Sequence, residues 1–452
     1  MAAEERTKGV VVVSEVLDDA RFSRFHLILI LLCTLIAIAD GFDTTALAVI
    51  APTIAKGWGL GLPSFAPALS ASLVGMALGG ATGGMLGDRF GRRPIIILMF
   101  SIVTVATLAS GFAVNISQLE ALRLLTGFGI GGTIPLGAAL VAEYMPKKLR
   151  SFLLVVMFSG HALGGTLAGL TAPVLIHNFG WHGVFIAGGV VPAVLVVALL
   201  VFLPESARYL TNRGGADARL RAMGLLKRAN PAVRLDPDAE IVTGEQVAAR
   251  GSVRDLFAPS RASQTIFLWI TFFATQFVLF GLASWLTGLL TQAGHSQDVG
   301  AYAQMLHNLG GVFGSLAFGL LSDRLSARPV LIGVNFGAIV FIACLGAFAA
   351  SSFSLWMAMF SGIFVLAAQL CLNAYTTGLY PTALRATGVG WALSFGRLGS
   401  ITSPLVAGAL MAQGWTPSSL FYAIAAVPLI SIVALTFIRG ERYETDGASA
   451  AH

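Results

Sequence analysis

The sequence predicts an all-α integral membrane protein whose twelve transmembrane helices form two halves of six. Composition is the first observation, because the 452 residues are 56% hydrophobic and only 11% charged, whereas soluble domains carry about 25% charge. The second observation is a series of apolar runs near the length of roughly 20 residues that crosses a bilayer. The predicted spans are 25–50, 64–86, 94–113, 118–143, 152–176, 182–203, 264–290, 299–321, 329–349, 353–379, 386–411 and 416–438.

An internal repeat is the third observation. A shift of 235 positions places Asp88-Arg89 on Asp323-Arg324, and Arg93-Pro94 on Arg328-Pro329. The same shift places Gly75, Gly79, Gly84, Gly111 and Gly127 on Gly310, Gly314, Gly319, Gly346 and Gly362. Two parallel membrane halves around a site at the bilayer midplane are typical of secondary transporters.

The repeat and the polar stretches predict four segments. Residues 1–203 form the first six-helix half with a short N-terminal tail, and residues 204–263 form a polar linker of mixed charge. Residues 264–438 form the second half, and 439–452 a C-terminal tail. The tail before the first span has no cleavage-site pattern, so we expect that span itself to target the chain to the membrane.

Basic residues predict the orientation. Lys and Arg gather in the loops after the second, fourth, eighth and tenth spans, whereas the opposite loops hold almost none beyond Lys56. Positive loops stay in the cytoplasm, so both termini should be cytoplasmic. The net charge of +6 reflects this asymmetry and indicates anionic membrane lipid rather than nucleic acid as the partner. Cys33, Cys344 and Cys371 lie within spans and show no disulfide or metal-ligand spacing.

The loop after the second span and its repeat predict a cytoplasmic gate. The glycines permit a tight turn, and Asp88 can accept hydrogen bonds from a neighbouring helix N-terminus. A plain cytoplasmic anchor is the alternative. Glu143, Arg150 and Arg385 lie near the ends of adjoining spans and extend the charged set. The predicted gate residues are Gly87, Asp88, Arg89, Arg92, Arg93, Glu143, Arg150, Asp323, Arg324 and Arg385.

Two aspartates in the first span are candidates for proton coupling. Asp40 and Asp43 are three residues apart and share one helix face, and each carboxylate at that depth costs about 2.5 kcal/mol or more. Arg123, near the start of the fourth span, should lie at a similar depth, because the two spans run in opposite directions. We therefore predict an Asp43–Arg123 pair; the alternatives are that the acids only pack against basic residues and that Arg123 extends to the outer interface.

The remaining candidates are polar or aromatic residues at mid-depth. Arg397 lies near the centre of the eleventh span, where a guanidinium needs an anion. That anion is either a substrate carboxylate or an internal acid or carbonyl. The other predicted substrate-binding residues, with Arg123, are His161, Gln276, Trp285, Gln369, Asn373 and Tyr375; helix packing is the alternative for each.

The motifs resemble those of a known family. Gly84 to Pro94, Gly-Met-Leu-Gly-Asp-Arg-Phe-Gly-Arg-Arg-Pro, resembles the loop 2–3 signature of the major facilitator superfamily. Asp40-Gly41-Phe42-Asp43 and the segment from Tyr380 to Arg397 are similar to the aromatic acid:proton symporter family within it. The resemblance spans the whole chain. It implies a major facilitator fold and proton-coupled uptake of benzoate, hydroxybenzoates or related acids across a bacterial inner membrane.

The resemblance also implies functional roles at positions that the residues themselves suggest, namely Asp40, Asp43, Asp88, Arg123, Glu143, Arg385 and Arg397. Other functions stay open: a sugar or polyol symporter, because Pro204 to Arg208 resembles a sugar-porter motif, a proton-driven exporter, or a sensor. No nucleophile–base pair or metal cluster is apparent, so we expect no enzyme, cofactor or metal. We expect a monomer, as for most of the superfamily.

Overall fold

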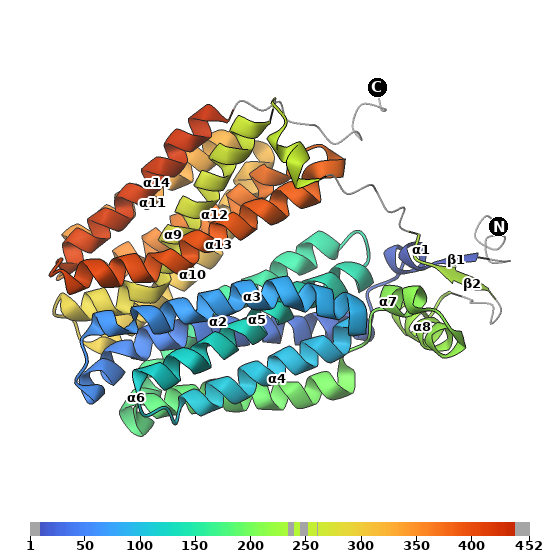
Figure 1. Cartoon of the computed structure of the whole chain (residues 1–452), viewed down its shortest axis with the longest axis horizontal. Coiled ribbons are helices and arrows are strands. Elements are labelled where there is room, and N and C mark those ends of the chain that lie inside the picture. Colours follow the sequence, from blue (N-terminus) through green and yellow to red (C-terminus); the bar gives the residue numbers. More distant parts are fainter. Residues whose placement is uncertain (1–9, 234–238, 245–251, 260, 439–452) are drawn as a thin grey trace.

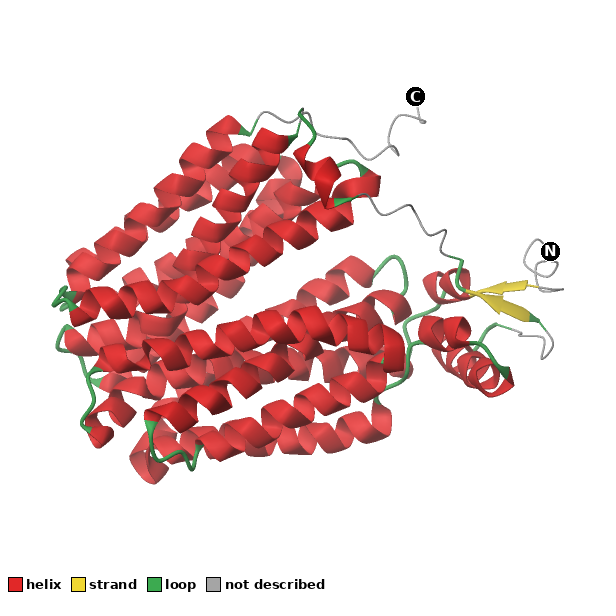
Figure 2. Ribbon diagram, in the orientation of Figure 1, coloured by secondary structure: helices red, strands yellow, loops and turns green. Residues whose placement is uncertain are grey.

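The structure is a computed structural model, and it describes residues 10–233, 239–244, 252–259 and 261–438. Long helices form two bundles that follow one another along the chain (Figure 1), and nearly all of the described residues outside the connections are helical (Figure 2). The first bundle contains α2 (Arg24–Trp58), α3 (Ala66–Phe90), α4 (Arg92–Ser110), α5 (Ile116–Tyr144) and α6 (Arg150–Phe202). The second contains α9 (Ala262–Gln292), α10 (Gln297–Arg324), α11 (Ala327–Ala347), α12 (Ser354–Thr377), α13 (Thr382–Ala412) and α14 (Pro417–Phe437).

Helix α6 is 53 residues long and includes two predicted spans. Its Gly180 has a non-helical conformation (φ 67°, ψ −177°) that divides the helix into two segments. Only glycine adopts such a positive φ without strain. Among the described residues, nine helices, with α6 counted once, are long and apolar enough to cross a membrane. Helices α10 and α13 have 28 and 31 residues, and each includes side chains outside the described part of the structure.

The repeated glycines have the same packing role in both halves. A Cβ atom on Gly127 of α5 would lie 1.9 Å from the carbonyl oxygen of Ser72 in α3. A Cβ atom on Gly362 of α12 would lie 1.9 Å from the carbonyl oxygen of His307 in α10. Only glycine permits such close backbone contact, so the repeat in the sequence is also a repeat in helix packing.

The buried core is continuous between the halves at one end only. We call the end that carries the linker helices the linker end and the other the far end. The far-end apolar cluster joins buried residues of both halves, including Val49 and Phe65 with Trp285 and Leu286. At the linker end, two separate clusters each draw their buried residues from one half and from the adjoining linker. The halves are therefore packed together at the far end and apart at the linker end.

Short elements at the linker end join the N-terminal tail to the linker. Strand β1 (Val10–Val12) pairs in parallel with β2 (Glu240–Val242), so two distant parts of the chain meet beside the first half (Figure 1). The short helices α1 (Val13–Asp18), α7 (Ala207–Arg213) and α8 (Ala216–Ala229) also belong to this end, and the 3-10 helix η2 (Val253–Phe257) precedes α9. A second 3-10 helix, η1 (Leu62–Phe65), precedes α3 at the far end. Asn230 donates a hydrogen bond to the Val16 carbonyl at 3.0 Å.

Candidate functional site

The Asp43–Arg123 ion pair forms in the interior of the first half. Nη1 of Arg123 lies 3.0 Å from each carboxylate oxygen of Asp43. Asp43 is 4% exposed and Arg123 is fully buried. A guanidinium at this depth needs a counter-charge, and the carboxylate of α2 supplies it to the guanidinium of α5.

Three further side chains hold this pair, and the sequence analysis did not identify them. Thr107 donates a 2.7 Å hydrogen bond to Asp43, and Arg123 donates one of 2.8 Å to Ser110. Cζ of Arg123 lies 4.9 Å from the ring centroid of Phe185, a distance at which a cation is attracted to the ring face. Both charged partners are therefore held in place independently of each other.

Asp40 forms a second cluster one turn away. Its carboxylate lies 2.9 Å from Nδ1 of His161 on α6, and Thr44 donates a 3.3 Å hydrogen bond to it. Arg397 of α13, in the other half, is close enough to Asp40 for the two charges to interact. Within the described residues, no hydrogen bond or ion pair involves the Arg397 guanidinium. Its donors are therefore available to an anion in the space between the halves.

Three of the predicted substrate-binding residues, Gln276, Gln369 and Asn373, carry amide side chains and belong to the second half. A Cβ atom on Gly396 would lie 3.1 Å from Cγ of Gln276, so the Gln276 side chain lies against α13 next to Arg397. Gln369 donates a 3.1 Å hydrogen bond to Asn373. The buried Oε1 atoms of Gln276 and Gln369 have no hydrogen-bond partner in the described chain. These amides can still accept hydrogen bonds from a ligand.

The two predicted aromatic residues lie in apolar packing. Trp285 is 1% exposed and donates a hydrogen bond to the Pro404 carbonyl at 3.2 Å, within the far-end core. Tyr375 belongs to the linker-end cluster of the second half and is 7% exposed. Asp43 instead lines a small cavity between the halves, together with Phe280 and Ser284 of α9.

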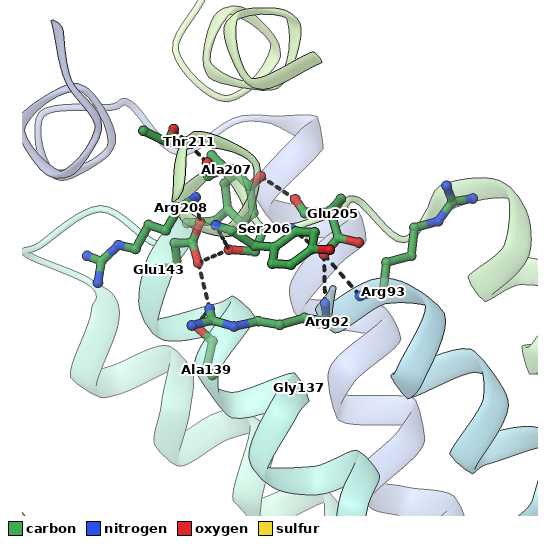
Figure 3. A network of polar contacts seen from close by, with 12 residues as sticks. Arg92, Arg93, Gly137, Ala139, Glu143, Glu205, Ser206, Ala207, Arg208 and Thr211 are labelled. Carbon is green, nitrogen blue, oxygen red and sulfur yellow. Dashed lines mark hydrogen bonds and ion pairs between the residues drawn. The ribbon is translucent and has the colours of Figure 1, made fainter. Parts of the chain in front are cut away.

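Glu143 organises the gate residues of the first half (Figure 3). Its carboxylate accepts hydrogen bonds from Arg92 Nη1 at 2.6 Å, from the Ser206 hydroxyl at 2.7 Å and from the Arg208 backbone N–H at 2.9 Å. Glu143 is only 2% exposed. One buried carboxylate thus joins the start of α4, the end of α5 and the start of α7.

Glu205, not Asp88, is the carboxylate at the nearby helix N-terminus. It accepts hydrogen bonds from the backbone N–H groups of Arg92 and Arg93 at 2.8 and 3.2 Å, at the start of α4 (Figure 3). The positive end of the helix dipole favours a carboxylate there. Asp88 is exposed and, with Arg89, lines a surface pocket beside α7. The sequence analysis noted Glu205 only as part of a resembling motif.

The other predicted gate residues are more dispersed. Gly87 packs against Leu136, where a Cβ atom would lie 2.5 Å from its Cδ2 atom. Arg150 forms an ion pair with Asp18 of α1, and Arg385 lies half-buried in the first turn of α13. Asp323 and Arg324 end α10, and their side chains lie outside the described part of the structure.

Hydrogen bonds between the two halves lie at the far end. Thr53 of α2 donates to Oε1 of Gln297 on α10, and Nε2 of Gln297 donates to the Val49 carbonyl at 3.0 Å. Ser70 of α3 donates to the Ile401 carbonyl of α13 at 2.9 Å. These uncharged contacts close the far end together with the shared apolar core, and none of them was expected from the sequence.

Comparison with known proteins identifies the family. The model of the Major Facilitator Superfamily matches residues 33–314 and residues 268–451. The chain belongs to the major facilitator superfamily. The two overlapping matches agree with the repeat, and the resemblance in the motifs is confirmed by relatives that are aromatic acid transporters.

Those superfamily relatives match over almost their whole length. The chain is 34% identical to the 4-hydroxybenzoate transporter of Pseudomonas aeruginosa, over 91% of this chain and 92% of that one. It is 31% identical to the benzoate transport protein of Acinetobacter baylyi, over 95% and 93%. Both are transporters and not enzymes.

A solved superfamily structure has the same fold. The crystal structure of a D-xylose-proton symporter superposes with a TM-score of 0.72 at 15% sequence identity, covering 91% of this chain and 97% of the other. The predicted all-helical major facilitator fold is thereby confirmed, and the chain is a multi-pass membrane protein.

Proposed function

We propose that the protein is a proton-coupled symporter that imports aromatic carboxylates such as benzoate or hydroxybenzoates by alternating access. The observation that carries this proposal is the Arg397 guanidinium, which lies between the halves without a hydrogen bond or ion pair in the described chain. Arginine binds a carboxylate through two parallel hydrogen bonds. The relatives that transport 4-hydroxybenzoate and benzoate support this substrate class.

The membrane arrangement is part of the proposal. Twelve spans follow if α6 crosses twice, with Gly180 at the turn, and if α10 and α13 also cross. The linker end and both termini face the cytoplasm of a bacterium, and the protein works in the inner membrane as a monomer. The halves are residues 1–203 and 264–438, with 204–263 as linker and 439–452 as tail. With the far end packed, this arrangement corresponds to an inward-facing conformation.

Asp43 is the proposed proton carrier. When the far end is open to the more acidic outside, protonation of Asp43 removes its negative charge and weakens its hold on Arg123. The substrate carboxylate then binds to Arg397, with Arg123 contributing once it is released. Closure of the far end and opening of the linker end expose the site to the higher internal pH, where the proton leaves.

The second half is proposed to bind the ring. Gln276 lies next to Arg397, and Gln369 and Asn373 lie on α12. His161 keeps Asp40 oriented. Trp285 and Tyr375 contribute to packing in this conformation, so any ring stacking by them requires that the halves move.

Uptake into proteoliposomes tests the proposed function. Labelled benzoate and 4-hydroxybenzoate should accumulate only with an inward proton gradient, and each should compete with the other. No uptake of either acid by folded, inserted protein would overturn the substrate assignment. Competition by sugars alone would identify a sugar symporter, and outward flux against a gradient would identify an exporter.

A further inference from the structure

A buried glutamine on α10 has no hydrogen bond. Gln304 is fully buried, and neither its Oε1 nor its Nε2 has a hydrogen-bond partner in the described chain. Buried polar groups are nearly always paired, and an unpaired one destabilises the fold. The amide can therefore pair with a group from outside the chain, a water molecule or a ligand.

The position of Gln304 on its helix directs it toward the other half. Gln297, Gln304 and Asn308 are spaced by seven and four residues, so they lie on one face of α10. Gln297 contacts Val49 and Thr53 of α2. The Asn308 amide and the Thr45 hydroxyl both lie within 3 Å of the point where a Cβ atom of Gly165 would stand (2.6 and 2.8 Å). Gln304, between them, therefore faces the seam between the halves, where transporters of this architecture bind substrate.

The depth of Gln304 can be compared with that of Arg397 through α9. Gln276 of α9 lies against Gly396, next to Arg397. Thr287 donates a hydrogen bond to the Gly300 carbonyl at 3.1 Å, and Gln304 is one turn from Gly300 toward the linker end. Gln304 therefore lies level with the part of α9 that is seven residues from Gln276 toward the far end. Measured along the axis of α9, this level is about 10 Å from Gln276. This separation suits an aromatic ring with a carboxylate at one end and a polar substituent at the other.

We infer that Gln304 binds the ring hydroxyl opposite the carboxylate, and so sets the preference for para-hydroxylated over unsubstituted aromatic acids. A primary amide can both donate to and accept from a hydroxyl. The inference rests on the proposed function, because it requires the substrate carboxylate to bind at Arg397. It adds a residue that distinguishes between substrates of the proposed class.

The substitution Q304M tests the inference, because methionine keeps the length and flexibility of glutamine without the amide. The experiment compares the KM for 4-hydroxybenzoate and for benzoate in proteoliposomes, and the Tm in detergent. Q304M should raise the KM for 4-hydroxybenzoate about tenfold, the size expected for one lost hydrogen bond. The KM for benzoate should stay within twofold. The Tm should not fall, because no protein hydrogen bond is lost.

The matched control is Q264M, on α9. Gln264 is also buried, but it donates a 2.9 Å hydrogen bond to the Leu379 carbonyl. Q264M should lower the Tm and leave the ratio of the two KM values unchanged. Equal changes for both acids in Q304M, or a fall in its Tm like that of Q264M, would overturn the inference while the proposed function stands. If the wild type takes up neither acid, the proposed function fails, and the role of Gln304 fails with it.

Discussion

Nη1 of Arg123 contacts both carboxylate oxygens of Asp43 at 3.0 Å, and this contact joins α2 to α5 inside the first half. Each partner has a further hydrogen bond of its own, from Thr107 to Asp43 and from Arg123 to Ser110. Protonation of the carboxylate would therefore weaken the charge pair without releasing either side chain completely. This is a suitable arrangement for a group that must gain and lose a proton repeatedly.

Replacing Asp43 by asparagine should separate coupling from binding. The amide keeps the size and hydrogen-bonding capacity of the carboxylate but cannot carry the proton. D43N should abolish accumulation driven by a proton gradient and retain part of the exchange of external for internal substrate. Flux of labelled benzoate with and without the gradient measures both. The control is D217N, in an exposed i,i+4 pair on α8, which should accumulate substrate normally. Concentrative uptake by D43N would exclude Asp43 as the carrier.

Arg397 should affect binding more than stability. Because its guanidinium has no hydrogen bond or ion pair in the described chain, R397Q should leave the Tm nearly unchanged and raise the KM for benzoate tenfold or more. R397K should retain part of the affinity, since lysine cannot form the two parallel hydrogen bonds. Ligand-induced shifts in Tm provide a second measure of binding. A large fall in Tm with an unchanged KM would show that Arg397 is structural.

Removing the charge of Glu143 should lower the stability of the protein, because Glu143 pairs with Arg92 at the linker end. E143Q keeps the shape of the side chain but removes the charge opposite Arg92, whose side chain is 20% exposed. Breaking a buried ion pair costs about 3–5 kcal/mol, and partial solvation of Arg92 reduces the expected loss to about 2 kcal/mol. Thermal unfolding of E143Q, R92Q and the double variant gives the coupling energy. Additive effects of the two substitutions would exclude a coupled pair.

A cross-link at the far end should stop transport. Thr53 and Gln297 are in direct contact across the two halves through the end of the glutamine side chain. Thr53→Cys and Gln297→Cys together, in a variant without Cys33, Cys344 and Cys371, should therefore be joined by a short, reducible thiol-specific cross-linker. Uptake should cease after cross-linking and return with a reductant. Each single variant should be insensitive to the cross-linker. Full transport by the cross-linked protein would show that the far end does not open during the cycle.

The sequence predicted the central ion pair because helix direction and rise place Asp43 and Arg123 at a similar depth, on two spans expected to line the cavity. It did not predict Thr107 and Ser110 as their partners. Hydroxyl groups in membrane helices commonly bond to their own helix backbone, as Thr104 does to the Phe100 carbonyl. Composition does not distinguish the few that point toward a neighbouring helix.

At the linker end, the sequence pointed to the wrong acidic residue. Both Asp88 and Glu205 are acidic residues near the start of α4, and the sequence favoured Asp88 because it lies in the loop. Glu205 occupies the helix N-terminus instead, because the chain after α6 returns to that position. Gln304 could not be selected from the sequence, since its lack of a partner is a property of its surroundings and not of its spacing.

The pairing of β1 with β2 has a consequence for biosynthesis. Val10 emerges from the ribosome before α2, but its partner Glu240 follows only after the whole first bundle. The N-terminal strand must therefore wait, unpaired, while α2 to α6 enter the bilayer. This small sheet can therefore form only after the helices of the first half have been made.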